Sequence, residues 1–421
     1  MDTKIEKQYK VAQERYAAAG VDTDKVLSVL KSIPISVNCW QGDDVSGFES
    51  DTAALAGGGI MVTGGYPGKP RNIDELRKDT QKAFSMIPGK KKLALHAMYG
   101  DFKGKFEGRD KIEIKHFESW VDWAKTNKAG LDFNPTLFSH PYARDGYTLA
   151  STNEKIRKFW VEHINRSREI GDYMGGSLKQ VCSNNIWIPD GSKDTSVNRL
   201  KHREKLLKSL DEIFSKKYSD KNIQDSLEPK LFGIGVESYT AGSLEFYLGY
   251  AVKNGLQITL DAGHFHPTEL VSDKITAVLP FVKGVQLHVT RSVRWDSDHI
   301  PILTEELVAI MQEIVRAKAL NKVFIGTDYF DASINRIGAW VIGARSVIKA
   351  LMIALLEPTD AIRKYEEEKN YFARLAMLEE LKFMPCGDIW NYYCETEGMA
   401  RDSQMVAAVM DYEKEVLSKR A

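Results

Sequence analysis

The sequence predicts an α/β protein built on a closed (β/α)8 TIM barrel and extended by helices at its C-terminal end. Short apolar segments alternate eight times with longer amphipathic segments, which is the pattern of repeated βα units around a parallel sheet. Acidic, imidazole and aromatic side chains recur where the apolar segments end, and a parallel barrel places its functional site there. An open doubly wound sheet is the alternative, but no GxGxxG segment opens a helix.

The elements follow in a regular order. Two helices are expected within residues 3–32, before the first strand. Strands are expected at residues 35–40, 93–98, 130–135, 181–187, 231–237, 256–261, 284–290 and 322–328. Helices are expected at residues 73–86, 116–127, 153–174, 197–216, 243–254, 269–282, 303–318 and 334–356. We therefore expect a catalytic barrel with N-terminal helices in residues 1–356, and a helical tail for packing and oligomerisation in residues 357–421.

Composition excludes several classes of protein. The 421 residues carry 58 Lys and Arg against 58 Asp and Glu, and a net charge of zero argues against a nucleic-acid groove. No apolar run approaches 18 residues, so we expect no membrane span, and the charged N-terminus predicts no cleaved secretion signal. The cysteines, Cys39, Cys182, Cys386 and Cys394, show no CxxC spacing, which favours a reduced, cytoplasmic location.

The segment Asp261-Ala-Gly-His-Phe-His-Pro267 follows the sixth expected strand. A carboxylate and an imidazole three residues apart, Asp261 and His264, can both face one metal ion on the turn after a strand. The alternative is a hydrogen-bonded turn in which the two side chains satisfy backbone groups.

Similar metal-ligating side chains follow the neighbouring strands. The candidate ligands are Glu237, Asp261, His264, His288, Asp296, Asp298 and Asp328. Five buried carboxylates cannot all ionise side by side without cations, so the set favours two divalent ions, Mn²⁺, Mg²⁺ or Co²⁺, rather than a structural Zn²⁺. Taken singly, Glu237 and Asp328 could instead form salt bridges, and His288 could be a core histidine.

Three further polar residues lie near these ligands in the sequence. We expect His266 and His299 to stand behind the metal ligands rather than bind metal themselves. Asp331 is expected to cap the N-terminus of the following helix.

Strands one to four are expected to end in aromatic or imidazole side chains instead: Trp40, His96, Phe133 and Trp187. Aromatic faces with a few polar groups suit the C–H faces of a sugar. The alternative is ordinary core packing.

A glycine-rich segment, residues 55–70, follows the first strand. It lacks the GxxxxGK[ST] spacing of a phosphate loop, because Thr63 stands where the first Gly belongs and Pro70 where Ser or Thr belongs. A mobile lid beside the site and an inert surface loop are both compatible with it.

Five motifs resemble those of the L-rhamnose isomerase family. They are Cys39-Trp-Gln-Gly-Asp-Asp44, Asn185-Ile-Trp-Ile-Pro-Asp-Gly191, Asp261-Ala-Gly-His-Phe-His-Pro267, Val293-Arg-Trp-Asp-Ser-Asp-His299 and Phe330-Asp-Ala-Ser-Ile-Asn335. The resemblance spans nearly the whole chain. It implies a barrel of the xylose-isomerase type with two divalent metals per subunit, usually Mn²⁺, for which Co²⁺, Mg²⁺ or Zn²⁺ can substitute. It also implies a cytoplasmic homotetramer. The implied reaction converts L-rhamnose to L-rhamnulose, the first step of rhamnose breakdown.

The resemblance also implies roles for individual residues. Those matching the structural-metal ligands are Glu237, Asp261, His288 and Asp328. Those matching the catalytic-metal ligands are His264, Asp296 and Asp298. Those matching the sugar pocket are Trp40, His96, Phe133 and Trp187. One departure is expected: related isomerases carry a Lys two residues after the first metal-binding Glu, where this chain has Tyr239.

These expectations lead to a metal-assisted 1,2-hydride shift in an aldose–ketose isomerase. Asp296 or Asp298, with His264, would support proton transfer between O2 and O1, and His96 would assist ring opening. The main alternative is a metal-dependent sugar epimerase on the same barrel. A nuclease acting at abasic sites conflicts with the neutral charge, and a non-catalytic sugar-binding protein would not require two metals.

Overall fold

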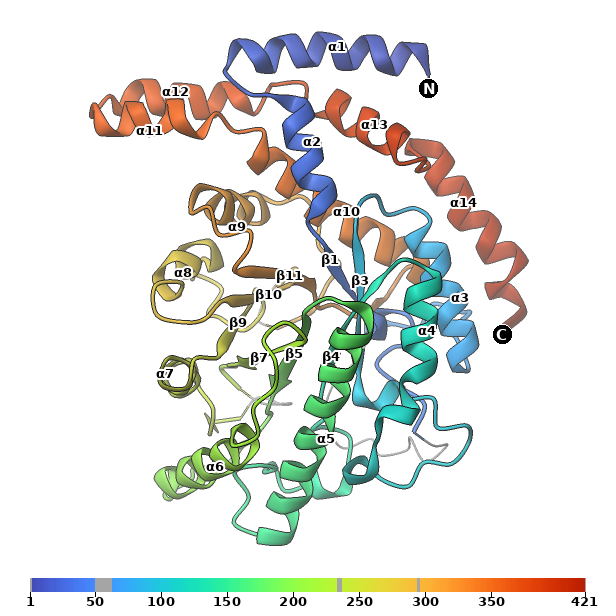
Figure 1. Ribbon diagram of the computed structural model, residues 1–421, viewed down its shortest axis with the longest axis vertical. Helices are drawn as coiled ribbons and strands as arrows, with labels where there is room; N and C mark the ends of the chain where they lie inside the picture. Colours follow the sequence, from blue (N-terminus) through green and yellow to red (C-terminus); the bar gives the residue numbers. More distant parts are fainter. Residues whose placement is uncertain (1, 50–62, 233–236, 294–295, 421) are drawn as a thin grey trace.

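The computed structural model describes residues 2–49, 63–232, 237–293 and 296–420 of the chain (Figure 1). Residues 55–62 of the glycine-rich segment lie outside the described residues, as do Arg294 and Trp295. The expectation of a lid therefore stays a prediction.

Over the described residues, eight parallel strands close into a barrel, which confirms the predicted fold class (Figure 1). The strands are β1 (Ile35–Asn38), β3 (Lys91–His96), β4 (Gly130–Asn134), β5 (Cys182–Trp187), β7 (Ile223–Glu228), β9 (Gln257–Asp261), β10 (Val285–Val289) and β11 (Val323–Thr327). Their spatial order, β1-β11-β10-β9-β7-β5-β4-β3, brings the last strand beside the first. All carboxyl ends therefore open on one side of the barrel.

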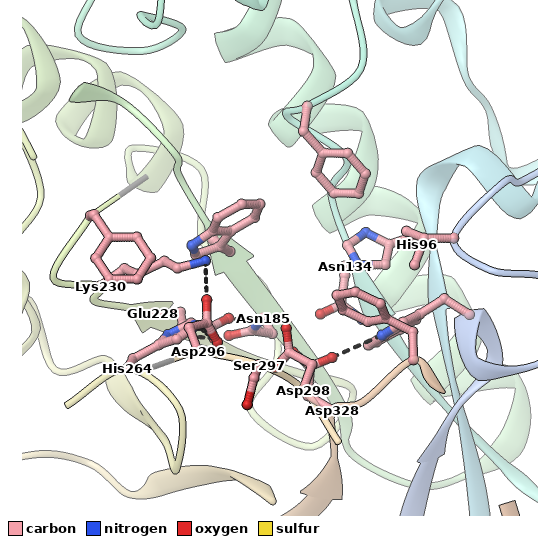
Figure 2. Close-up of a pocket in the computed structure, with 16 residues that line it drawn as sticks. His96, Asn134, Asn185, Glu228, Lys230, His264, Asp296, Ser297, Asp298 and Asp328 are labelled. Carbon is pink, nitrogen blue, oxygen red and sulfur yellow. Dashed lines mark hydrogen bonds and ion pairs between the residues drawn. The ribbon is translucent and has the colours of Figure 1, made fainter. Parts of the chain in front are cut away.

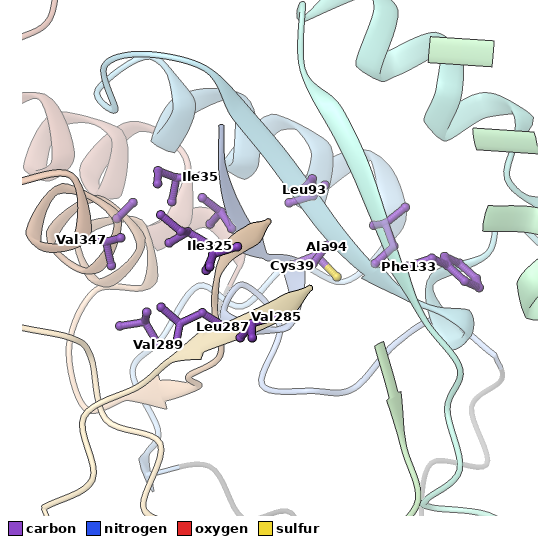
Figure 3. Packing of buried hydrophobic residues seen from close by; sticks show 14 of the residues in the cluster. Ile35, Cys39, Leu93, Ala94, Phe133, Val285, Leu287, Val289, Ile325 and Val347 are labelled. Carbon is purple, nitrogen blue, oxygen red and sulfur yellow. The ribbon is translucent and has the colours of Figure 1, made fainter. Parts of the chain in front are cut away.

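Helices surround the strands: α3 (Ile73–Phe84), α4 (Glu118–Thr126), α5 (Glu154–Leu178), α6 (Arg199–Phe214), α7 (Leu244–Asn254), α8 (Val271–Val278), α9 (Glu305–Arg316) and α10 (Arg336–Leu355). Each buries an apolar stripe, as α9 does with Leu307, Ile310, Met311 and Ile314. Figure 3 shows Ile325 of β11 beside Val347 of α10, within the apolar layer between sheet and helices.

The fifth strand lies earlier in the chain than the sequence predicts. The fifth barrel strand is β7, which ends at Glu228, so its predicted place at residues 231–237 is wrong. Residues 233–236 lie outside the described residues. The polar residues of β7 are matched by distant partners: Asp225 accepts from Arg168 at 3.0 Å, and Ser226 shares a hydrogen bond with Thr259 at 2.7 Å. The strand therefore lacks the apolar pattern on which the prediction relied.

Two short strand pairs flank the barrel opening. β6 (Gly191–Ser192) pairs with β8 (Tyr239–Thr240), and β12 (Asp331–Ala332) pairs with β2 (Thr63–Gly64).

The N-terminal helices and α11 to α13 lie above the barrel, and α14 runs down its side beside α3 (Figure 1). They are α1 (Thr3–Ala18), α2 (Thr23–Ser32), α11 (Thr359–Glu367), α12 (Tyr371–Leu381), α13 (Cys386–Thr396) and α14 (Asp402–Glu415). Tyr9 of α1 stacks on Tyr392 of α13, with ring centroids 3.7 Å apart. Tyr412 of α14 donates to Asp79 of α3 at 2.7 Å, so the tail contacts both the N-terminal helix α1 and the barrel.

Within the described residues one helix, α10, is long and apolar enough to cross a membrane by length and composition. Its apolar window is 78% buried inside the molecule, as in a core helix of the barrel. Arg345 and Lys349 interrupt its apolar residues, so α10 contains no continuous apolar run of the length considered in the sequence.

Candidate metal centre

A cavity of about 290 Å³ opens at the carboxyl ends of the strands (Figure 2). Both polar groups and aromatic rings line it, and some of the rings contact the polar groups directly. The lining residues include Trp40, His96, Asn134, Phe138, Trp187, Glu228, Lys230, His264, Asp296, Asp298, Asp328 and Phe330.

Four acidic and imidazole groups from adjacent strands meet beside this cavity. They are Glu228, Asp261, His288 and Asp328, and their ligand atoms all lie within 4.8 Å of one another. Nδ1 of His288 is central: it lies 3.3 Å from Oδ2 of Asp328, 3.5 Å from Oε1 of Glu228 and 3.7 Å from Oδ2 of Asp261. We call these four residues the first ligand group.

A second ligand group consists of Asp261, His264 and Asp296, also within 4.8 Å of one another. Nδ1–H of His264 donates to the Pro229 carbonyl at 3.0 Å, which turns Nε2 toward Oδ1 of Asp296 at 3.5 Å. A side chain at position 263 would obstruct this arrangement, because a Cβ there would lie 2.7 Å from Oδ1 of Asp296 and 3.1 Å from Oδ1 of Asp261.

Several buried atoms of both groups lack a hydrogen-bond partner. They are Oε1 of Glu228, Oδ2 of Asp261, Nδ1 of His288 and Oδ1 of Asp296. Buried polar atoms are normally satisfied, and leaving a carboxylate oxygen unpaired is costly. Mixed oxygen and imidazole donors converging in this way fit divalent cations.

The electrostatics of the ligand groups also favour cations. Burial, followed by the charges of Glu228 and Asp328, raises the pKa of Asp261 to about 7. Burial also raises the pKa of Asp298 well above its usual value, with Asp296 next in effect. Burial alone would lower the pKa of His288, but Glu228 and Asp328 hold it well above its usual value. Bound cations would relieve the repulsion among these carboxylates.

Comparison with known proteins identifies the family. A family model described as L-rhamnose isomerase (RhaA) matches residues 3–420. The chain belongs to the L-rhamnose isomerase family. The five sequence motifs that suggested this family are thereby confirmed as indicators of it.

Relatives in the L-rhamnose isomerase family match the chain from end to end. The L-rhamnose isomerase of Rhodopirellula baltica is 52% identical over 417 residues, covering 99% of this chain and 97% of that protein. The L-rhamnose isomerase of Enterobacter sp. (strain 638) is 52% identical over 420 residues, covering 100% of both. Among solved structures, an L-ribulose 3-epimerase is similar with a TM-score of 0.47 and 11% identity, over 76% of this chain and 95% of that chain.

In this member of the L-rhamnose isomerase family, most of the expected metal ligands are brought together. Asp261, His264, His288, Asp296 and Asp328 all belong to the two ligand groups. Asp298 lies outside both groups but lines the same cavity.

Glu237 does not join the ligand groups, and Glu228 takes the expected position at the end of the fifth strand. Glu237 instead precedes β8, where its Cγ lies 3.4 Å from the position of a Cβ on Gly191. The assignment of Glu237 followed from placing the fifth strand too late in the chain. The sequence Glu228-Pro-Lys230 was the available signal, since Pro229 marks the end of a strand.

The position of the expected departure changes with the choice of Glu. Lys230 lies two residues after Glu228 of the first ligand group, whereas Tyr239 lies in β8 and donates to the Arg199 carbonyl at 3.2 Å. Nζ of Lys230 lies 2.5 Å from Oδ2 of Asp296 and 4.7 Å from the ring centroid of Trp187 (Figure 2). Burial would lower the pKa of Lys230, but Asp296 raises it above the usual value, so the ammonium stays charged.

Three of the four predicted sugar-pocket residues line the cavity, and one does not. Trp40, His96 and Trp187 line the cavity as expected, whereas Phe133 does not. Phe133 points to the outer layer and packs edge-on against Phe117, with ring centroids 5.0 Å apart. Successive strand residues face opposite sides, so the next residue along β4 lines the cavity instead. Three phenylalanines that were not predicted as pocket residues, Phe138, Phe232 and Phe330, also line the cavity.

His96 packs against Trp40, which in turn binds an acid of the first ligand group. Its ring lies edge-on to Trp40 with centroids 4.6 Å apart, and Trp40 donates to Oδ1 of Asp328 at 2.8 Å. Burial lowers the pKa of His96 to about 4, so the imidazole is neutral near pH 7 and one ring nitrogen can accept a proton. Nδ1 of His96 lies 3.4 Å from the Thr136 hydroxyl.

A buried arginine holds the loop that carries Phe138. Arg109 donates to the Thr136 carbonyl at 2.9 Å and to the Phe138 carbonyl, and its guanidinium also binds Glu49 at 2.8 Å. This arginine was not predicted from the sequence, because its partners are backbone atoms of a distant loop.

The remaining predicted residues lie at the edge of the site. His266 is exposed on a turn, with Nδ1 2.7 Å from the Thr268 hydroxyl. Nδ1 of His299 lies 3.6 Å from Oδ2 of Asp331. The prediction that Asp331 caps a helix is wrong: Asp331 accepts from the backbone of Ser333, and Asn335 caps α10.

Proposed function

We propose that the protein is an aldose–ketose isomerase that converts L-rhamnose to L-rhamnulose at the start of rhamnose breakdown. The single observation that carries this proposal is the family match over residues 3–420. The two ligand groups beside an aromatic cavity support it, because a sugar needs polar donors on one side and apolar surface on the other.

We infer two divalent cations per subunit, Mn²⁺ by preference, with Co²⁺, Mg²⁺ or Zn²⁺ able to substitute. The first ligand group would hold one, and the second ligand group, with Asp298 beside it, would hold the other. When bound, such cations polarise sugar oxygens and lower the pKa of coordinated water. The unpartnered buried atoms of both groups support this assignment.

The chain's own residues have distinct tasks in the proposed reaction. Trp40 and Trp187, with Phe138, would pack on the C–H faces of the sugar and exclude water. Neutral His96 would take the proton of the anomeric hydroxyl as the C1–O5 bond breaks and would return it to the ring oxygen O5. A hydride would then pass from C2 to C1 of the open aldose, while a proton moves from O2 to O1.

Two acids and a lysine would support that proton transfer. Asp296 and Asp298 line the cavity and would orient the proton-carrying group. Lys230 is held by Asp296 and stays charged, so it would stabilise negative charge developing on the substrate oxygen.

The function is tested by incubating chelator-treated protein with L-rhamnose labelled with deuterium at C2. We expect a ketose by NMR only after Mn²⁺ is added, with the deuterium retained at C1. Co²⁺, Mg²⁺ and Zn²⁺ should each restore part of the activity. An epimer of the starting aldose as the product, in place of a ketose, would favour the epimerase. Loss of the deuterium to solvent would contradict the hydride shift.

We also propose a homotetramer, in which residues 357–421 contribute to the subunit contacts. No residue of α12 is buried. In and just after this helix, Tyr371, Phe372, Leu375 and Phe383 are large exposed apolar side chains, with Phe372 83% and Phe383 84% exposed. Exposed patches of large apolar side chains mark contact surfaces. Sedimentation should give the mass of four chains, and replacing both Phe372 and Phe383 by Glu should reduce it; a monomeric wild type would contradict the proposal.

A cytoplasmic location is proposed on the state of the cysteines. Cys39, Cys182 and Cys394 are buried and all four cysteines are free thiols, as expected in a reducing compartment. Fractionation of the source cells should recover the isomerase with cytoplasmic markers; recovery with an exported fraction would contradict this.

A further inference from the structure

Two residues of β10 point into the barrel, one below the other. Gln286 is 5% exposed, and its amide nitrogen Nε2 lies 3.1 Å from Nε2 of His288. Its oxygen Oε1 accepts a hydrogen bond of 2.7 Å from the hydroxyl of Ser183 in β5. Gln286 is therefore wedged between a member of the first ligand group and the opposite wall of the barrel.

Ser183 rests in turn on a fixed ion pair. Its backbone N–H donates to Oδ1 of Asp132 at 2.7 Å, and Lys92 donates to the same oxygen at 2.6 Å. All three residues are buried, with Ser183 1%, Asp132 3% and Lys92 6% exposed. These contacts hold Ser183, the hydrogen-bond partner of Gln286, in place beneath the ligands.

The donor and acceptor requirements of His288 decide what Gln286 must do. Nδ1 of His288 faces the three carboxylates of the first ligand group and has no hydrogen-bond partner, so it is the nitrogen that would bind a cation. A ligating nitrogen uses its lone pair, so Nε2 must carry the proton and donate it. Among the described residues, the side chain of Gln286 lies within hydrogen-bond distance of Nε2.

Gln286 satisfies this requirement only with its oxygen toward His288. In the structure the amide nitrogen faces His288 and the oxygen faces Ser183. A turn of the amide would exchange the two atoms. The Ser183 hydroxyl can both donate and accept, so it can hold the amide in either orientation.

We propose that Gln286 is the positioning residue for His288 in the cation site and that Ser183 holds it there in both amide orientations. With a cation bound, the oxygen of Gln286 accepts from Nε2–H of His288 and fixes the imidazole ring against the cation. This inference rests on the cation site proposed above, and removal of Gln286 should weaken one of the two cation-binding steps.

The test measures metal affinity rather than activity. Metal-free wild type, Gln286→Leu, Gln286→Glu and Gln257→Leu are titrated with Mn²⁺ by calorimetry. Gln257 is a matched control: it is a buried glutamine of the neighbouring strand β9, 1% exposed, whose amide donates to Gln224 instead. We expect Gln286→Leu to weaken one binding step by about 10- to 100-fold, the usual effect of losing a hydrogen-bond partner of a metal-bound His.

The other variants separate positioning from packing. Gln286→Glu should bind Mn²⁺ at least as tightly as wild type, because a carboxylate accepts from Nε2–H in any orientation. Gln257→Leu should bind like wild type. If Gln286→Leu fails to fold, Ser183→Ala removes the partner of the amide with a smaller change and should weaken the same step.

A spectroscopic measurement reports the hydrogen bond itself. In the Co²⁺-loaded wild type, the paramagnetically shifted N–H proton of His288 should exchange slowly with solvent, and in Gln286→Leu it should exchange faster. Equal Mn²⁺ affinity of wild type and Gln286→Leu, or equal loss in Gln286→Leu and Gln257→Leu, would overturn the inference. A wild type that binds no Mn²⁺ would instead refute the cation site.

Discussion

Glu228→Gln is expected to lose the cation of the first ligand group and to slow L-rhamnose turnover by about 1,000-fold, or ~4 kcal/mol of transition-state stabilisation. Oε1 of Glu228 is buried, has no hydrogen-bond partner and lies 3.5 Å from Nδ1 of His288. Oε2 of Glu228 accepts a hydrogen bond from Asn185. The amide keeps the shape of the side chain and removes its charge. Bound Mn²⁺ and turnover would both be measured on the purified variant.

The matched control is Glu237→Gln, because Glu237 is the residue that the sequence alone suggests for the same role. Glu237 lies outside both ligand groups, so this variant should retain its metal and turn over within about twofold of wild type, as surface and loop changes usually do. If Glu237→Gln loses metal and Glu228→Gln keeps it, the assignment made from the structure is refuted.

Asp296→Asn is expected to leave a folded protein with about 1,000-fold lower kcat. The substitution removes the charge that pairs with Nζ of Lys230 at 2.5 Å and lies 3.5 Å from Nε2 of His264. Lys230 would then be a buried ammonium without its main partner, which lowers its pKa and weakens its interaction with the substrate. kcat and KM would be measured with saturating Mn²⁺, and circular dichroism would check the fold.

Asp331→Asn provides the comparison for this second variant. Asp331 is also a buried acid at the barrel opening, 5% exposed. Its carboxylate accepts a hydrogen bond from the backbone N–H of Ser333, and the amide oxygen of an Asn can accept the same bond. The variant should show nearly wild-type kcat. Turnover of metal-loaded Asp296→Asn within tenfold of wild type would remove Asp296 from the catalytic machinery.

Strands that rely on apolar packing were predictable from the sequence. In β10, Val285, Leu287 and Val289 alternate with polar residues that face the barrel interior, which is the standard signal of a strand. β7 carries Asp225 and Glu228 instead, and these are compensated by side chains from other strands and helices. No local pattern announces such pairing, so a more apolar segment further along the chain was preferred.

The same distinction applies to the site. Asp261 and His264 were predictable because one turn carries both, and the strand end that precedes them is clear. Phe133 was misassigned because the end of a strand does not reveal which of two neighbouring residues faces inward. Phe138 lies beyond the strand and reaches the cavity only because Arg109 holds its loop.

The absence of a side chain at Gly263 restricts how this enzyme can be engineered. Any larger residue would push an atom into the carboxylates on either side of it, 2.7 Å and 3.1 Å away. Mutant libraries intended to broaden the range of accepted sugars should therefore leave this position unchanged. Diversity is better introduced at Val45 and Phe138, which line the cavity without belonging to either ligand group.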